Sequence, residues 1–350
     1  MKYLAIFTFL ILLSCNQEQN TNNNNASNQE ESNSKGTLSD IEQNILENPD
    51  NPVAYFNRAV FYKNNKKYSR AIEDINRALR ILPDSNAFKY EKAEILYNSG
   101  IFKQNKSQLD ESKIYLDNIL KSEENNIKSL LLKAKILIFE KDTDASMKTL
   151  VRILKKEPTF AEAYFLKGLI YEIIGNDNLA KSSYQTTIEM EVNYYDAYIN
   201  LGILYAKDMN NKAISYYNSA LEIYPNSIEA LRNKGLFYHF SEDYINARKN
   251  FNKIISIDSL FEEAYFNIGN TYIGMYKYDL SDYSKDTTLN RAIEYFNKAI
   301  SINPNYVQAI YNLGLQYQYK GEVDSAKKYY LRAIDLENNY TPALDAINSL

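Results

Sequence analysis

The stretch AYFLKGLIYEIIGNDNLAKSSYQTTIE, residues 163–189, contains the pattern that decides the fold of this chain. Gly168 is followed three residues later by Tyr171, and Ala180 is followed four residues later by Tyr184. Side chains three or four residues apart lie on one face of an α-helix, so each half of the stretch has a face with one small and one large residue. Small residues allow two helices to approach closely, and large residues fill the space beside them. The stretch therefore predicts two packed helices, which we call helix A and helix B.

The same hairpin pattern recurs along most of the chain. The small residue of helix A returns at steps of 34, 41, 34, 34, 33, 34 and 45 residues, as Ala59, Ala93, Ala134, Gly168, Gly202, Gly235, Gly269 and Gly314. The small residue of helix B runs in parallel, as Ala71, Ser112, Ser146, Ala180, Ala213, Ala247, Ala292 and Ala326. A period near 34 residues is typical of solenoids built from helical hairpins.

Residues 163–189 and the stretch AIYNLGLQYQYKGEVDSAKKYYLRAIDLEN, residues 309–338, resemble the tetratricopeptide repeat. The resemblance implies an all-α fold, a right-handed α-solenoid of about eight helical hairpins with a short capping helix at each end. We place the repeats at 52–85, 86–126, 127–160, 161–194, 195–227, 228–261, 262–306 and 307–340, and the capping helices at 38–51 and 341–350.

Repeats two and seven are longer than the others. Their extra residues predict loops at 102–109 and 275–289. Insertions in solenoids map to loops on one edge, often the edge that binds a partner. A longer helix A with a tolerated surface loop is an equally good interpretation, because lengthening a loop costs little free energy. We also expect Gly100, Gly175 and Gly321 in turns between helix A and helix B, where glycine tolerates a positive φ.

The N-terminal residues resemble the leader of a bacterial lipoprotein. An apolar run at residues 3–14 is too short to span a bilayer, and it ends at Cys15, the only cysteine of the chain. The motif LLSC at residues 12–15 resembles a lipobox, which implies that residues 1–14 are a signal peptide and that Cys15 is lipidated. An uncleaved signal anchor or a chance cysteine is the alternative.

Residues 15–37 predict a flexible tether behind the lipid. The segment is rich in asparagine and contains almost no apolar residue, so it cannot bury enough surface to become ordered. Asn16 stands where enterobacterial lipoproteins retained at the inner membrane carry aspartate, which favours the outer membrane. Some Bacteroidetes lipoproteins carry an acidic surface-export signal here, and Glu18 alone matches it. We expect an outer-membrane lipoprotein on the periplasmic face, with surface exposure as the alternative.

The composition argues against several classes of function. The chain has 40 Lys and Arg against 44 Asp and Glu, a net charge of −4, so it has no basic excess for binding nucleic acid. His239 is the only histidine, so no set of cysteines and histidines could hold zinc. We also find no glycine-rich strand–helix loop of the kind that holds phosphate. We therefore expect no enzymatic activity, no cofactor and no metal.

Helix A faces the concave groove in tetratricopeptide solenoids, so the resemblance implies a row of groove positions. Two residues before the small residue of helix A, five repeats carry an asparagine: Asn57, Asn200, Asn233, Asn267 and Asn312. An amide both donates and accepts hydrogen bonds, so it can pair with the backbone of an extended peptide. The row resembles the asparagine ladder in the groove of O-linked N-acetylglucosamine transferases. The alternative is that asparagine is simply common at this position of the repeat.

The residue before each of these positions is mostly large and often aromatic. The groove candidates in this second row are Phe56, Tyr90, Phe165, Arg232, Phe266 and Tyr311. Aromatic anchors beside amides suit a protein or peptide partner, although such rings also pack against neighbouring repeats. The sequence predicts a lipid-anchored adaptor that binds a protein or an extended peptide in a cell-envelope assembly. The alternative is a structural spacer or a self-assembling scaffold, a homo-oligomer without a groove ligand.

Overall fold

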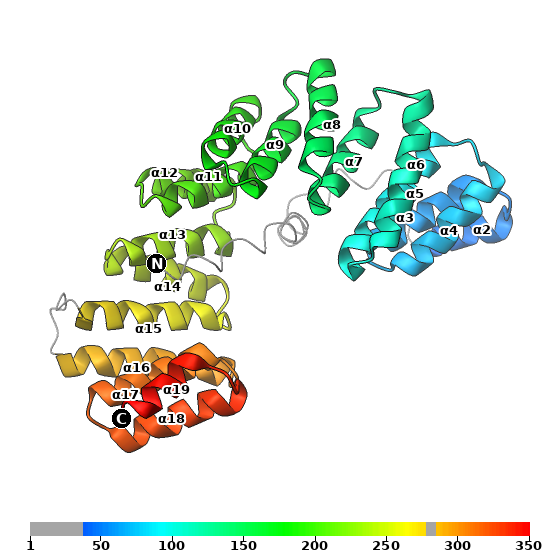
Figure 1. Ribbon diagram of the computed structural model, residues 1–350. Helices are drawn as coiled ribbons and strands as arrows, with labels where there is room; N and C mark the ends of the chain where they lie inside the picture. The colour runs from blue at the N-terminus through cyan, green and yellow to red at the C-terminus, as the bar shows by residue number, and fades with distance from the viewer. Residues whose placement is uncertain (1–37, 278–284) are drawn as a thin grey trace. The chain divides into compact units, whose positions relative to one another are not determined.

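The structure is a computed structural model that describes residues 38–277 and 285–350. These residues form eighteen α-helices and no strand (Figure 1). The chain divides into two compact units, of which unit 1 ends at Val192 and unit 2 begins at Asn193. The expected fold class, an all-helical solenoid of paired hairpins, is confirmed.

Unit 1 consists of one short helix followed by four hairpins. In each hairpin, helix A packs most extensively against the helix B that follows it. The helices are α2 (Leu38–Glu47), α3 (Pro52–Asn64), α4 (Tyr68–Ile81), α5 (Asn86–Lys103), α6 (Lys106–Ser122), α7 (Ile127–Phe139), α8 (Thr143–Lys156), α9 (Ala161–Ile173) and α10 (Asp177–Met190).

Unit 2 consists of four hairpins followed by one short helix. Figure 1 shows helices α15 and α16 of this unit side by side, the pairing that every hairpin repeats. The helices are α11 (Tyr195–Lys207), α12 (Lys212–Ile223), α13 (Ile228–Phe240), α14 (Tyr244–Ile257), α15 (Glu262–Lys277), α16 (Lys285–Ile302), α17 (Val307–Tyr319), α18 (Val323–Leu336) and α19 (Thr341–Asn348).

The small residue of each helix A receives a large side chain from helix B. A Cβ atom added at Gly202 would lie 2.4 Å from Cε1 of Tyr217, and one added at Gly314 would lie 2.7 Å from Cε1 of Tyr330. Both tyrosines are buried almost completely. Such contacts leave no room for a methyl group at these glycines, so the period in the sequence is the period at which a large side chain of helix B lies on helix A.

Ser112 and Ser146 replace the small alanine on helix B without disturbing this packing. The hydroxyl of Ser112 donates to the backbone carbonyl of Ala93 at 2.7 Å, and that of Ser146 donates to the carbonyl of Ala134 at 3.1 Å. Both serines are fully buried. Because each buried hydroxyl has a partner on helix A, the substitution adds a hydrogen bond between the helices of the hairpin.

Different residues form the starts of helices and the turns between helix A and helix B. Helices α8, α10 and α14 begin with Asp142, Asn176 and Asp243, whose side chains accept a hydrogen bond from the backbone three residues later. Each described turn between helix A and helix B has one residue with positive φ: Lys66, Gln104, Lys141, Gly175, Met209, Glu242 and Gly321. Gly175 and Gly321 therefore lie in these turns, as expected.

The prediction of a loop at residues 102–109 is wrong and the alternative of a longer helix A is confirmed, because the extra residues of repeat two lengthen its helices. Helices α5 and α6 have 18 and 17 residues, with Gln104 and Asn105 alone between them. Gly100 consequently lies inside α5 and not in a turn, buried against Leu109. In repeat seven, residues 275–277 end α15 and 285–289 begin α16, while 278–284 lie outside the described residues.

Short helices cover the first and last hairpins. Ala343 and Ala346 of α19 are buried in one apolar cluster with Tyr330 of α18. Leu38 of α2 packs against the apolar cluster of the first hairpin. A solenoid needs such covers, because its terminal repeats have no neighbour to bury their apolar faces.

The signal peptide, lipidated Cys15 and tether predicted for residues 1–37 lie outside the described residues. No helix of the described part is both long enough and apolar enough to cross a bilayer.

Candidate functional site

The predicted amide row falls on successive A helices of unit 2. Asn200, Asn233, Asn267 and Asn312 occupy equivalent positions on α11, α13, α15 and α17. Asn200, Asn233 and Asn267 are only 5%, 4% and 8% exposed, and Asn312 is half-buried. We call these four residues the asparagine ladder.

Three members of the asparagine ladder have an unpaired polar atom. Nδ2 of Asn200, Oδ1 of Asn233 and Nδ2 of Asn267 are buried and lack a hydrogen-bond partner within the described chain. A buried polar atom without a partner costs about 1–3 kcal/mol of folding free energy. Most buried polar groups in folded proteins have a partner, so these three atoms at one repeat position are exceptions to that rule.

Asn312, the last residue of the ladder, has a hydrogen-bond partner for its side chain. Its Nδ2 atom donates to Oδ1 of Asn270 on α15 at 2.8 Å. The amide of Gln316, one turn later on α17, donates to the backbone carbonyl of Asn312 at 3.3 Å. The C-terminal end of the ladder is thus held by one hydrogen bond between α15 and α17 and by one within α17.

Charged residues lie beside the ladder at the starts of the A helices. Arg232, predicted as a groove residue, pairs with Glu263, with Nε and Oε1 separated by 2.7 Å. The hydroxyl of Tyr195 donates to Glu229 at 3.3 Å. Acidic residues in the first turn of a helix interact favourably with its dipole, so these carboxylates also stabilise their own helices. Arg232 is therefore positioned on the neighbouring repeat by an ion pair.

The predicted aromatic row is built into the packing of the hairpins. In unit 2, the Phe266 ring lies 5.9 Å from Phe296 and 5.0 Å from Tyr306, and the Tyr311 ring lies 5.7 Å from Tyr330. These contacts join helix A to helix B and, through Tyr306, to the residue that precedes α17. Sequence reasoning placed the rings on helix A correctly, but the spacing alone does not distinguish a ring facing the groove from one between helices.

The aromatic row of unit 1 also contributes to the packing between helices. Phe56 stacks on Phe88 with ring centres 5.1 Å apart, and Phe165 lies buried with its ring 5.5 Å from Tyr184. Tyr90 is half-buried, and burial raises the pKa of its hydroxyl. These rings therefore pack against other apolar residues of the protein. Their role in ligand binding stays a prediction.

The amide row is interrupted in unit 1 by an ion pair. Asn57 is exposed, and the next position holds Glu91, whose Oε1 lies 2.9 Å from Nζ of Lys63. Lys63 also pairs with Glu94. Burial raises the pKa of Glu91 although Lys63 opposes this shift, and the two carboxylates raise the pKa of Lys63 against the effect of its burial. Because Lys63 already pairs with both carboxylates, this part of the row offers fewer groups to a ligand than the ladder of unit 2.

A pocket that the sequence analysis does not predict lies between the last hairpin and the helix that covers it. A cavity of about 700 Å³ lies between α17 and α19. Its walls include Tyr311, Leu315 and Tyr319 from α17, and Pro342 and Ala346 from α19. Continuing the helix A spacing from Tyr311 into residues 341–350 would have found it, because α19 takes the place of a ninth helix A. We call this cavity the end pocket.

His239 lies at the end of α13. Its ring packs at 5.4 Å from Phe240 and 5.6 Å from Tyr244, and its Nδ1 atom lacks a hydrogen-bond partner. Burial lowers the pKa of His239. In residues 38–277 and 285–350, no three His, Cys, Asp or Glu side chains are grouped so as to hold a metal ion.

Curated relatives share part of their length with this chain. Anaphase-promoting complex subunit 3 of Schizosaccharomyces pombe is 26% identical over 141 residues, which are 40% of this chain and 21% of that protein. Photosystem I assembly protein Ycf3 of Acaryochloris marina is 30% identical over 106 residues, which are 29% of this chain and 63% of that protein. The chain therefore spans less than two thirds of the length of either relative.

Solved structures share its fold. Yeast Tom70 superposes with a TM-score of 0.53 at 15% identity, covering 85% of this chain and 62% of Tom70. PilW, a type IV pilus biogenesis factor, superposes with a TM-score of 0.50 at 17% identity, covering 64% of this chain and 97% of PilW. At these identities the likeness concerns the fold alone.

The repeats themselves match a known family. Models of the tetratricopeptide repeat match residues 52–85, 161–191, 196–227, 228–259, 283–306 and 295–328. The matching models describe a helical scaffold repeat and not a catalytic domain. With its paired helices, its small and large residues in register and these matches, the chain belongs to the tetratricopeptide repeat family.

Proposed function

We propose that the asparagine ladder of unit 2 binds an extended segment of a protein partner, and that the chain acts as an adaptor. The observation that carries this proposal is the row of unpaired polar atoms on Asn200, Asn233 and Asn267. An extended peptide presents alternating N–H and C=O groups, and an amide can pair with either. The ladder would therefore recognise backbone and tolerate many side chains.

The end pocket supplies the side-chain selectivity that the ladder lacks. Its walls are the rings of Tyr311 and Tyr319 together with Leu315 and Ala346, and Asp345 lies among its lining residues. A peptide that continues along the ladder would place an apolar or aromatic side chain here. Buried aromatic contacts of this kind supply much of the free energy of protein interfaces.

The N-terminal sequence supports placing this adaptor at a membrane of the cell envelope. Lipidation at Cys15 followed by the tether of residues 16–37 would leave the hairpins free to reach a partner. The names of both curated relatives, a subunit of a complex and an assembly protein, concern multi-protein assemblies. We propose an outer-membrane lipoprotein whose unit 2 engages a component of an envelope assembly from the periplasmic face.

Crosslinking in the source cells, followed by purification of the tagged chain and mass spectrometry, tests the groove. The test variant is Asn200→Ala/Asn233→Ala/Asn267→Ala. A matched control replaces three exposed amides of the B helices, Asn218, Asn252 and Asn297, with alanine. We expect the wild type and the control to recover the same envelope protein and the test variant to lose it. Equal recovery by all three would exclude the ladder as the binding site.

A self-assembling scaffold is the second candidate, and exposed apolar side chains favour it. Phe240 and Ile245 flank the turn after α13 and are 56% and 62% exposed. Exposed apolar residues of this size are common at sites of association between proteins. Light scattering over a range of concentrations tests this candidate. A monomer at every concentration excludes it, whereas crosslinking that recovers only the chain itself would favour it over the adaptor.

A further inference from the structure

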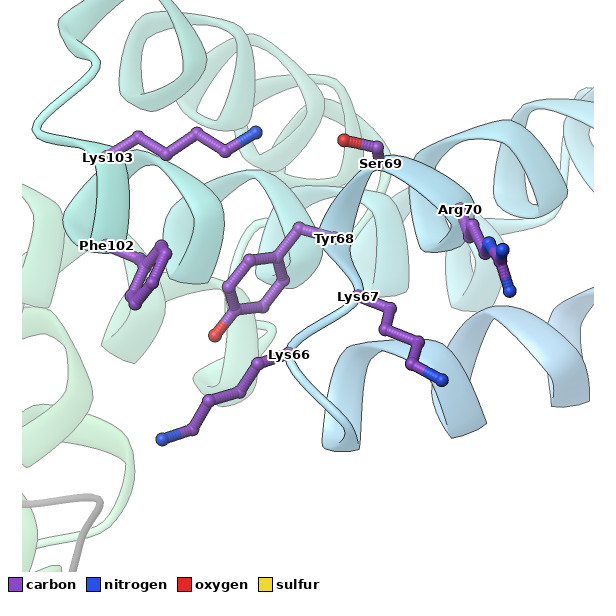
Figure 2. Close-up of a pocket in the computed structure, with 7 residues that line it drawn as sticks. All are labelled: Lys66, Lys67, Tyr68, Ser69, Arg70, Phe102 and Lys103. Atoms are coloured by element: carbon purple, nitrogen blue, oxygen red, sulfur yellow. The ribbon is translucent and has the colours of Figure 1, made fainter.

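A second surface, in unit 1, combines positive charge with exposed rings. A cavity of about 350 Å³ lies where the turn between α3 and α4 meets the C-terminal end of α5. Figure 2 shows the rings of Tyr68 and Phe102 beside each other, with Lys103 on one side and Lys66 on the other, while the side chains of Lys67 and Arg70 extend away from the rings. We call this surface the basic pocket and define it by its charges and rings: Lys66, Lys67, Arg70, Lys103, Tyr68 and Phe102.

The charges of the basic pocket are not neutralised by the protein. In the part of the chain that the structure describes, Lys66, Lys67 and Lys103 form no ion pair, whereas many lysines elsewhere do. Arg70 faces the ring of Tyr62 at 5.7 Å. Four positive charges without an ion pair among the described residues thus line one surface of a chain whose net charge is −4. Such a cluster attracts anions to this surface in particular.

Phe102 adds an exposed apolar ring to this charged surface. It is 66% exposed, although its ring contacts Tyr68 at a centroid distance of 5.9 Å. Protein interfaces are depleted of lysine at their centres. An exposed phenylalanine surrounded by lysines is instead the composition of segments that lie in the interface of an anionic membrane.

A short segment of sequence joins the predicted lipid anchor to unit 1, which carries the basic pocket. Twenty-two residues, 16–37, separate Cys15 from the first helix of unit 1, which begins at Leu38. A chain of that length spans at most about 75 Å. If Cys15 is lipidated, unit 1 is therefore confined near the same bilayer, at a high effective concentration.

We propose that the basic pocket docks unit 1 on a bilayer that contains anionic phospholipid. Phosphates of several lipid headgroups pair with the lysines at the edge of the pocket, and the ring of Phe102 enters the region below the headgroups. The first turn of α4 also lines the pocket, and its free N–H groups add to the attraction for phosphate. This contact needs neither the acyl chain nor the asparagine ladder.

Vesicle flotation tests this proposal with residues 15–350 carrying Cys15→Ser, so that no acyl chain contributes. The vesicles contain phosphatidylglycerol in one arm and phosphatidylcholine alone in the other. The test variants are Lys66→Gln/Lys67→Gln/Lys103→Gln and Phe102→Ser. The matched control, Lys249→Gln/Lys253→Gln/Lys328→Gln, removes three exposed lysines from unit 2. Circular dichroism verifies that each variant remains helical.

We expect binding to phosphatidylglycerol vesicles and none to phosphatidylcholine. Each lysine near an anionic surface contributes about fivefold in affinity, so the triple variant should bind about a hundredfold more weakly. Phe102→Ser should weaken binding about tenfold, and the control should bind like the wild type. Binding should also fall steeply between about 0.1 M and about 0.5 M salt.

Three results would overturn the proposal. The first is equal binding to both kinds of vesicle, or no loss in the triple variant. The second is that inorganic phosphate binds as tightly as the vesicles and is unaffected by Phe102→Ser, which would make the pocket a site for small anions. The third is that polyglutamate binds to the pocket while the vesicles do not, which would indicate an acidic protein partner.

Discussion

At the scale of single residues, two side chains determine how closely the helices of each hairpin approach. Where helix A carries alanine, at Ala59, Ala93 and Ala134, the large residue of helix B is Ile75, Leu116 or Leu150. Where helix A carries glycine, the partner is Tyr184, Tyr217, Phe251, Phe296 or Tyr330. The five glycines lie in unit 2 and the last hairpin of unit 1. Glycine thus provides the space that an aromatic ring requires and an aliphatic side chain does not.

Replacing a pair of glycine and aromatic residue with a pair of alanine and aliphatic residue gives a first prediction. Gly202→Ala should destabilise unit 2 by about 1–3 kcal/mol, because the new methyl group would overlap the buried ring of Tyr217. Gly202→Ala/Tyr217→Leu, which copies the pairs of unit 1, should be more stable than the sum of the two single changes by more than about 1 kcal/mol. Urea unfolding of the three variants measures this coupling. Additive effects would show that the two residues do not share space.

The unpaired amides give a second prediction, about stability. Asn200→Ala and Asn233→Ala each remove a buried polar atom without a partner and introduce a better helix former. Each should leave the free energy of unfolding unchanged or raise it by about 1 kcal/mol. Thermal unfolding of the purified chain, without partner, measures the effect. A loss of more than about 2 kcal/mol would show that these amides have structural partners, and would weaken the case for a ligand.

His239 gives a third prediction, about pH. Burial lowers its pKa in the folded chain below the unfolded value of about 6.5, so the folded state binds the proton less readily. Its contribution to stability is complete above the unfolded pKa and is lost as the pH falls through the folded pKa. His239→Gln should therefore gain stability relative to the wild type between about pH 7.5 and about pH 5.5. Urea unfolding of both proteins at the two pH values measures this gain. If the two proteins differed in stability by the same amount at both pH values, the lowered pKa of His239 would be contradicted.

At the scale of helices and turns, every described turn between helix A and helix B contains one residue with positive φ. Glycine holds this position at Gly175 and Gly321, whereas Lys141 and Glu242 adopt the same conformation with a side chain. A side chain in this region costs about 1–2 kcal/mol relative to glycine. The turn geometry is therefore a property of the hairpin and is imposed on whichever residue occupies the position.

Reciprocal substitutions give a fourth prediction. No atom lies within 4 Å of a Cβ added at Gly175, so Gly175→Ala should cost about 1 kcal/mol through the backbone alone. Lys141→Gly should relieve the same strain, but glycine also increases the entropy of the unfolded chain, so the net change should be small and stabilising. Thermal unfolding of both variants compares them. If Gly175→Ala is neutral, the left-handed turn is not strained for other residues.

The helices could be predicted from the sequence because the small and large residues recur in register. The extra residues of repeat two could not be assigned, because a longer helix and a loop satisfy the same spacing. Gly100 lies in α5 because the pair of long helices brings Leu109 against it, a contact between residues of two helices that local propensity does not reveal. The repeat register predicts that the aromatic row lies on helix A. It does not predict that rings such as Phe266 point between the helices and not into the groove.

At the scale of the whole molecule, the two candidate surfaces belong to different units. The asparagine ladder and the end pocket lie in residues 193–350, whereas the basic pocket lies within residues 1–192. The position of the ladder could be predicted from the sequence, since asparagine recurs in repeats five to eight. Its unpaired atoms could not, because burial and hydrogen bonding depend on the side chains of neighbouring helices.

This division gives the last prediction, that residues 193–350 fold and bind without unit 1. Each hairpin of a repeat protein contacts only its neighbours, so four hairpins and the covering helix α19 contain most of their own stabilising contacts. Residues 193–350 should be helical by circular dichroism and unfold cooperatively. In the crosslinking experiment the same fragment, joined behind residues 1–37 so that it is exported, should recover the partner of the full chain, and residues 1–192 should not. A folded fragment 193–350 that recovers nothing, beside a full chain that does, would move the binding site out of the ladder and into a surface that requires unit 1.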